Sequence, residues 1–198
     1  QHVKIFKSDL QGKCDSLVSD EKTGLTKLFT NPVLWAEGNQ ITGDIIHLIS
    51  NAKTEQLDSL KILNNAFMIQ KDSSGYSQMK GKNMYGKFKN NKLASLNNIG
   101  NSEVIFYLRD ENQKLIGISK MKSSNNIFIT MDNNTINSID FNTKPEGKTY
   151  PPSEFEKLNP VEKLFPGFIW RENERPLSKH AIFIHDEPII EDKTIQKN

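Results

Sequence analysis

The order of polar and apolar positions recurs four times along the chain. Each copy opens with a short polar marker, "QGK" at Gly12, "TGD" at Gly43, "KGK" at Gly81 and "SSN" at Ser124. An apolar pair with the spacing Leu/Ile-x-x-Leu/Ile follows each marker. The pairs are Leu25 and Leu28, Leu57 and Leu60, Leu93 and Leu96, and Ile136 and Ile139. Recurrence in a fixed order predicts an array of similar structural units.

A turn signal separates the marker from the pair in every copy. The four segments read "SDEKTG", "SNAKTEQ", "KNNK" and "DNNT". Asn and Asp favour tight reversals because they tolerate left-handed backbone and bond their own chain. The flanking apolar runs, such as "MYGKF" and "KLASL", are too short for helices and predict strands joined as hairpins. A third strand is expected in three copies, at 32–38, 66–72 and 102–110. The fourth copy lacks that run and continues into the Pro/Gly-rich segment 142–152.

Side chains alternate between the two faces of a strand, so the pattern also predicts which residues point inward. Ile46, Met84 and Ile127 are expected to form one aliphatic row, and Leu28, Leu60, Leu96 and Ile139 another, with Gly86 leaving a gap. The full inward set is Leu28, Ile46, Leu48, Leu60, Ile62, Met84, Phe88, Leu96, Ile127, Ile129, Ile139 and Phe141. The first residue of each pair falls on the other face, because a spacing of three is odd; it covers a strand end or sits at a bulge.

The array is expected to end near residue 150. Residues 1–150 form the β body, and 151–198 form an extension with two short helical turns interrupted by Pro160 and stopped by Pro166. Part of this extension is expected to dock on the body, while the last residues fray. Trp170 is interpreted as a cap on an apolar end of the array, whereas Trp35 is either such a cap or an anchor that contacts lipid or a partner.

Composition excludes several classes of function and structure. The 198 residues include 26 Lys and Arg against 24 Asp and Glu, so a whole-protein basic field for nucleic acid is absent. Only 35% of residues are hydrophobic, which suits a thin layer of packed sheets. Cys14 is the only cysteine, so no internal disulfide forms. No apolar run approaches the length of a membrane-spanning helix. The chain opens with Gln1, which we interpret as a mature form or a fragment from which any targeting segment is gone.

Four stretches together resemble a known family. The segments "HVKIFKSDLQGKCDSL", "NPVLWAEGNQITGDIIHLI", "SQMKGKNMYGKF" and "LIGISKMKSSNNIFI" are similar to the OstA-like family, over roughly residues 1–150. Its members are periplasmic lipopolysaccharide-transport proteins and the N-terminal domain of the outer-membrane lipopolysaccharide assembly protein. The resemblance implies an all-β fold, an open, folded-over β-jellyroll of repeated antiparallel strands.

The resemblance also implies a function. In this family the jellyroll shields lipopolysaccharide acyl chains in an apolar groove, in the periplasm or associated with the outer membrane, and binds other lipopolysaccharide-transport proteins end to end. The twelve inward residues are then the candidate groove lining. Self-association through edge strands is expected at "HVKIFK" and near Ile136 to Phe141. No cofactor and no catalytic residue belong to the family pattern.

Other interpretations of the same residues stay open. The inward rows can be ordinary core, and the repeats can be a scaffold that only binds other proteins by edge pairing. An enzyme acting on carbohydrate needs paired carboxylates in a cleft, whereas the acidic residues here are scattered in turns. His180 and His185 face opposite sides of a strand and lack a third ligand, so no metal site is expected.

Overall fold

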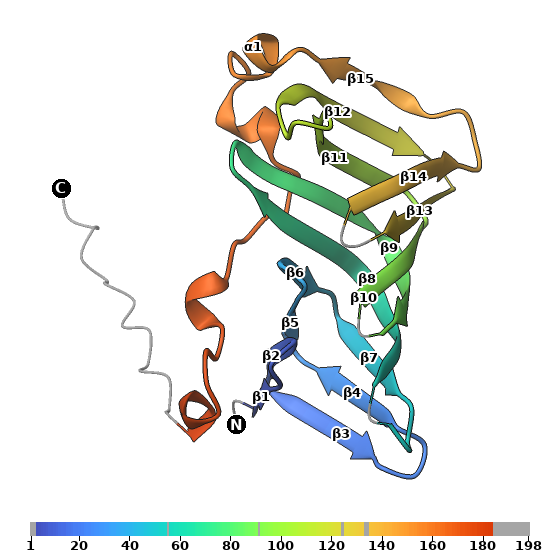
Figure 1. Cartoon of the computed structure of the whole chain (residues 1–198), viewed down its shortest axis with the longest axis vertical. Coiled ribbons are helices and arrows are strands. Elements are labelled where there is room, and N and C mark those ends of the chain that lie inside the picture. The colour runs from blue at the N-terminus through green and yellow to red at the C-terminus, as the bar shows by residue number, and fades with distance from the viewer. Residues whose placement is uncertain (1–2, 55, 91, 124, 133–134, 184–198) are drawn as a thin grey trace, which may run out of the picture.

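The protein is built almost entirely of antiparallel strands (Figure 1). The computed structural model describes residues 3–54, 56–90, 92–123, 125–132 and 135–183, with the backbone alone at 132 and 135–137. The strands are β1 Val3–Phe6, β2 Leu10–Cys14, β3 Ser16–Asp20, β4 Leu25–Phe29, β5 Val33–Ala36, β6 Asn39–Thr42, β7 Ile45–Ser50, β8 Leu57–Asp72, β9 Gly75–Lys89, β10 Lys92–Ile99, β11 Ser102–Arg109, β12 Leu115–Ser123, β13 Asn126–Asp132, β14 Thr135–Phe141 and β15 Glu146–Tyr150. None of the helices in these ranges is long and apolar enough to cross a membrane.

One sheet folds over into two walls, and the long strands β8 and β9 belong to both. The hairpin wall contains β3, β4, β7, the first part of β8, the second part of β9, β10, β13 and β14. The opposite wall contains β1, β2, β5, β6, the second part of β8, the first part of β9, β11, β12 and β15. Apolar side chains of the two walls form one shared cluster. The predicted all-β, open and folded-over jellyroll is therefore confirmed.

The chain crosses between walls at two kinds of corner. Gly43, between β6 and β7, and Gly81, within β9, leave no room for a side chain, since a Cβ would collide with Ile62 and Asn98 respectively. The return crossing uses two consecutive residues with positive φ, at Thr30–Asn31, Asn64–Asn65 and Gly100–Asn101. Two of the three marker glycines, Gly43 and Gly81, thus lie where the sheet folds over, whereas Gly12 lies within β2.

The four predicted hairpins are the units of the hairpin wall. They are β3–β4, β7–β8, β9–β10 and β13–β14. Register shifts follow Leu57, Leu93 and Ile136 in the last three hairpins. These bulges settle the alternative left open by the sequence: the extra residue places Leu93 in the interior with Leu96, although their spacing is odd.

The sequence interpretation was wrong for the end of the fourth copy. The Pro/Gly-rich segment 142–152 contains β15, which pairs with β12 and supplies the strand expected to be missing. Extended glycine and lysine residues pair through the backbone alone, so the segment needs no apolar alternation to form an edge strand. Free edges remain at both ends of the described sheet, since β1, β3, β14 and β15 each pair with one strand only.

Residues 151–183, here called the C-terminal strap, lie across the outer face of the opposite wall. The strap contains α1 Pro152–Phe155 and the 3-10 turns η1 Pro160–Lys163, η2 Glu172–Glu174 and η3 His180–Phe183. Pro160 begins the second turn instead of interrupting it. Phe155 and Phe165 are buried in a second apolar cluster with Phe67, Ile69, Ile105 and Ile118 of the wall. The predicted fraying concerns residues that lie outside the described part.

A candidate binding cavity between the walls

Strand register aligns the predicted inward residues into rows on the hairpin wall. The first row runs through Leu28, Ile46, Ile62, Met84, Asn98, Ile127 and Phe141. The second runs through Leu48, Leu60, Gly86, Leu96, Ile129 and Ile139. The expected row of Ile46, Met84 and Ile127 is present. Leu28 was assigned to the wrong row, because its hairpin lacks the bulge that shifts the later copies.

All twelve predicted residues lie in one interior cluster. Nine of them are buried, and Phe88, Ile139 and Phe141 are partly buried against the same cluster. Gly86 does not leave an open gap, because a Cβ there would come within 3.1 Å of the Leu93 side chain. The rows are therefore mostly packed against neighbours.

The opposite wall supplies the other half of the interior. These side chains, missed in the sequence, are Leu10, Cys14, Leu34, Ile41, Ala66, Met79, Val104 and Phe106. Alternation in "LQGKC" could have indicated Leu10 and Cys14, with Gln11 and Lys13 outward. Pairing this wall with the hairpins requires the fold itself, because the partners are far apart in sequence.

Space between the walls is uneven along the molecule. Near the β1 end a cavity of about 720 Å³ is lined by apolar side chains including Ile5, Leu10, Leu48, Leu57 and Phe88. Further along, a cavity of only about 20 Å³ remains beside Met79, Leu96, Phe106 and Ile129. The interior thus opens at one end and is packed shut in the middle.

Of the twelve predicted residues, Leu48 and Phe88 line the large cavity, and Leu96 and Ile129 line the small one. The remaining eight pack elsewhere in the interior cluster. Cavity-lining Ile5, Leu10 and Leu57 were not in the predicted set, although Leu57 was recognised as the first residue of its apolar pair.

The lining of the large cavity is only partly apolar and carries charges of both signs. Lys7, Asp9 and Lys179 contribute to it, together with Thr26 and Gln56. Within the described ranges no three His, Cys, Asp or Glu residues converge on a possible metal position. Burial raises the pKa of the Cys14 thiol in the interior, so this group is a neutral thiol at pH 7. His47 points out of the hairpin wall, where desolvation and its neighbours Lys27 and Lys61 lower its pKa.

Trp35 does not cap an end of the array. It lies in the middle of the opposite wall, in register with Gln11 and Gln40, and is buried on the outer face. Trp170 packs in the strap, with its ring 5.4 Å from that of Tyr76. Trp170 therefore belongs to the contact between strap and wall, and Trp35 lies in register between two glutamines that bond to the strap.

Comparison with known proteins identifies solved structures with a similar fold. No protein-family description matches the sequence, and no curated protein matches it. Among solved structures, the chain is similar to LptH of Pseudomonas aeruginosa, described as the LptA homologous periplasmic component of the lipopolysaccharide transport device. The two are 15% identical, and the match covers 69% of this chain and 95% of that chain. Its TM-score is 0.49.

Proposed function

We propose that this protein is a non-catalytic periplasmic lipid-binding conduit that shields lipopolysaccharide acyl chains on the way to the outer membrane. The observation that carries the proposal is the cavity of about 720 Å³ between the two walls, which is lined by apolar side chains together with polar and charged ones. Ligand pockets typically have volumes of about 300 to 1,000 Å³, with an apolar lining and a few polar groups. The sequence resemblance to OstA-like proteins supplies the class of lipid.

The binding energy comes from apolar burial. Each methylene moved from water into such a cavity contributes about 0.8 kcal/mol. Leu48, Leu57 and Phe88 on one side and Ile5 and Leu10 on the other provide the contacts. Acyl chains enter at this end, and their passage along the rows requires the walls to separate near Met79 and Phe106. The rest of the twelve inward residues are proposed to contact lipid in that separated state.

Partner binding is proposed at the free edges. Among the described strands, β1 and β3 at one end and β14 and β15 at the other each pair with one strand only, so each end is a candidate for strand addition. Other lipopolysaccharide-transport proteins, or a second copy of this chain, are the proposed partners. The same edges also support the alternative of a scaffold that binds only proteins.

Site-specific photo-crosslinking tests the lipid role. A photoreactive residue at Leu48, which lines the cavity, is expected to form adducts with lipopolysaccharide. The same residue at the neighbouring outward His47 is the matched control and is expected to form none. Equal labelling at both positions, or no labelling at Leu48, contradicts the conduit and leaves the scaffold.

A further inference from the structure

A single row of side chains crosses the outer face of the opposite wall beneath the strap. Paired residues on successive strands give the order Gln11, Trp35, Gln40, Ile69, Gln78, Ile105 and Lys120. The three glutamines are only 3%, 1% and 1% exposed. Buried amides need partners, because an unpaired buried amide is costly. Each of them has a partner in the strap, while Gln11 also donates to the carbonyl oxygen of Lys7 and Gln78 to that of Tyr76.

Two glutamines bind the strap through its backbone. Gln78 donates to the carbonyl oxygen of Lys163 at 3.0 Å and accepts from the amide of Phe165 at 2.8 Å. Gln40 makes the same two bonds six residues further along the strap. It donates to the carbonyl oxygen of Ile169 at 2.7 Å and accepts from the amide of Arg171. Each glutamine amide thus bonds the strap backbone as the peptide group of a neighbouring strand would. The strap is therefore held across the strands although it is itself not a strand.

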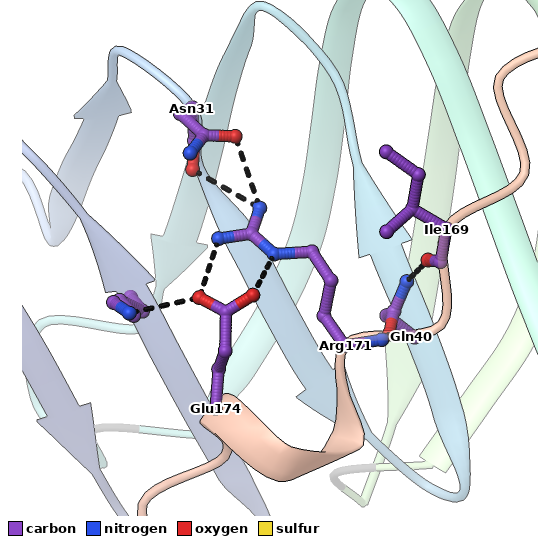
Figure 2. A network of polar contacts seen from close by, with 6 residues as sticks. Asn31, Gln40, Ile169, Arg171 and Glu174 are labelled. Carbon is purple, nitrogen blue, oxygen red and sulfur yellow. Dashed lines mark hydrogen bonds and ion pairs between the residues drawn. The ribbon is translucent and has the colours of Figure 1, made fainter. Parts of the chain in front are cut away.

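The strap is fixed near β2 by charged groups (Figure 2). Arg171 and Glu174 form a bidentate pair at 2.7 and 2.9 Å, and Arg171 also donates to the Asn31 side chain at 3.0 Å. Lys13 of β2 donates to Glu174 at 2.8 Å, and Arg175 donates to Gln11 of the same strand at 2.8 Å. Charge-assisted bonds of this kind are stronger than neutral ones.

β2 connects this fastening to the cavity. Its outward residues Gln11 and Lys13 hold the strap, whereas its inward residues Leu10 and Cys14 belong to the interior cluster. Leu10 lines the cavity. The strap then continues to the rim, where Lys179 lines the same cavity and η3 lies close to β1. One segment therefore clamps the wall from outside and forms part of the opening.

We propose that the C-terminal strap is a latch that controls entry to the cavity, with Lys13, Gln11 and the Arg171–Glu174 pair as its fastening. When the fastening opens, residues 176–183 leave the rim, β1 and β2 lose their outer support, and this end of the opposite wall moves away from the hairpin wall. The role of the strap in controlling entry rests on the proposed function, whereas its movement can be tested without any lipid.

Cys14 provides a native reporter for the movement. It is the only cysteine, it is 2% exposed, and it lies on the inner face of β2. The rate at which a small disulfide reagent labels the folded full chain reports how often this strand opens. The variant Lys13→Ala with Arg175→Ala is expected to label at least about tenfold faster, the factor for losing one charge-assisted hydrogen bond. Lys13→Arg, which retains the charge, should label like the unaltered protein.

The control variant removes an ion pair from the same sheet that is not part of the fastening. Lys122 pairs with Glu146 at 3.0 Å on exposed parts of β12 and β15, so Lys122→Ala should leave the labelling rate unchanged. Urea unfolding of each variant shows whether overall stability explains the rates. Unchanged labelling in the double variant overturns the latch. Equally fast labelling in Lys122→Ala overturns it too, because the effect would then be general loosening.

The binding kinetics of a fluorescent long-chain fatty acid then test whether the latch controls lipid entry. In the double variant its association and dissociation rates should rise by a similar factor, which is the behaviour of a gate. A change in dissociation alone assigns the strap to lipid contact and contradicts the gate. If the unaltered protein takes up no fatty acid and no lipopolysaccharide, the proposed function fails, while the Cys14 rates still decide whether the strap opens.

Discussion

Replacing Glu174 by glutamine tests the energetics of the strap directly. The Arg171 guanidinium and the Lys13 ammonium lower the pKa of Glu174 from 4.5 to about 2, against the opposing effect of burial. This difference corresponds to about 3 kcal/mol between the charged and neutral forms. The Glu174 side chain is 28% exposed, so water screens part of this interaction energy. We therefore expect Glu174 to contribute about 1 to 2 kcal/mol to the free energy of unfolding.

The stabilisation by Glu174 is expected to decrease at low pH. Because the folded pKa is lowered, the contribution is fully present above pH 4.5 and is lost as the pH falls from 4.5 towards 2. Glu174→Gln should therefore unfold about 1 to 2 kcal/mol more easily at pH 7 and no more easily than the unaltered protein near pH 2. Urea unfolding followed by tryptophan fluorescence measures this, since Trp170 packs in the strap and Trp35 is buried between Gln11 and Gln40, which bond to the strap.

Glu154→Gln is the matched control. Glu154 forms an exposed ion pair with Lys148 at 3.2 Å, a kind that contributes at most about 1 kcal/mol. The reasoning is refuted if Glu174→Gln unfolds like the unaltered protein at pH 7, or if its deficit persists undiminished near pH 2.

Three further outcomes are expected. Gly81→Ala should cost about 1 to 3 kcal/mol in urea unfolding, because its Cβ collides with the buried Asn98 amide at the corner of β9. Leu48→Trp fills the cavity and should weaken uptake of a fluorescent fatty acid at least several-fold, whereas Val18→Trp, 58% exposed, should not. Sedimentation velocity should show end-to-end association as concentration rises, and a strict monomer at high concentration contradicts pairing through the free edges.

Local patterns in the sequence were enough to predict the hairpin wall. The turn signals between markers and apolar pairs gave all four hairpins, and alternation placed Ile46, Met84 and Ile127 in one row. The bulges could not be assigned, because a spacing of three is compatible with a strand end as well. β15 was missed, since "EGKTY" lacks alternating apolar residues and is held by backbone pairing with β12.

The cavity and the strap depend on contacts that no local pattern encodes. Gln40 and Gln78 occupy outward strand positions, where a polar residue normally indicates solvent, yet the strap buries them from more than eighty residues away. Lys13 and Glu174 are separated by 161 positions. Alternation identifies the face on which a side chain lies, but a segment without periodicity gives no sign that it will cover that face.

The continuity of β8 and β9 constrains how the interior can open. They are the described strands that run through both walls, and they bend at Asn64–Asn65 and at Gly81. The corners at Thr30–Asn31, Gly43 and Gly100–Asn101 join the two walls in the same way, so the fold line crosses successive strands, and β1 and β3 lie at one end of the walls (Figure 1). A change of backbone angle at these corners would separate the far margins of the walls while every strand keeps its register.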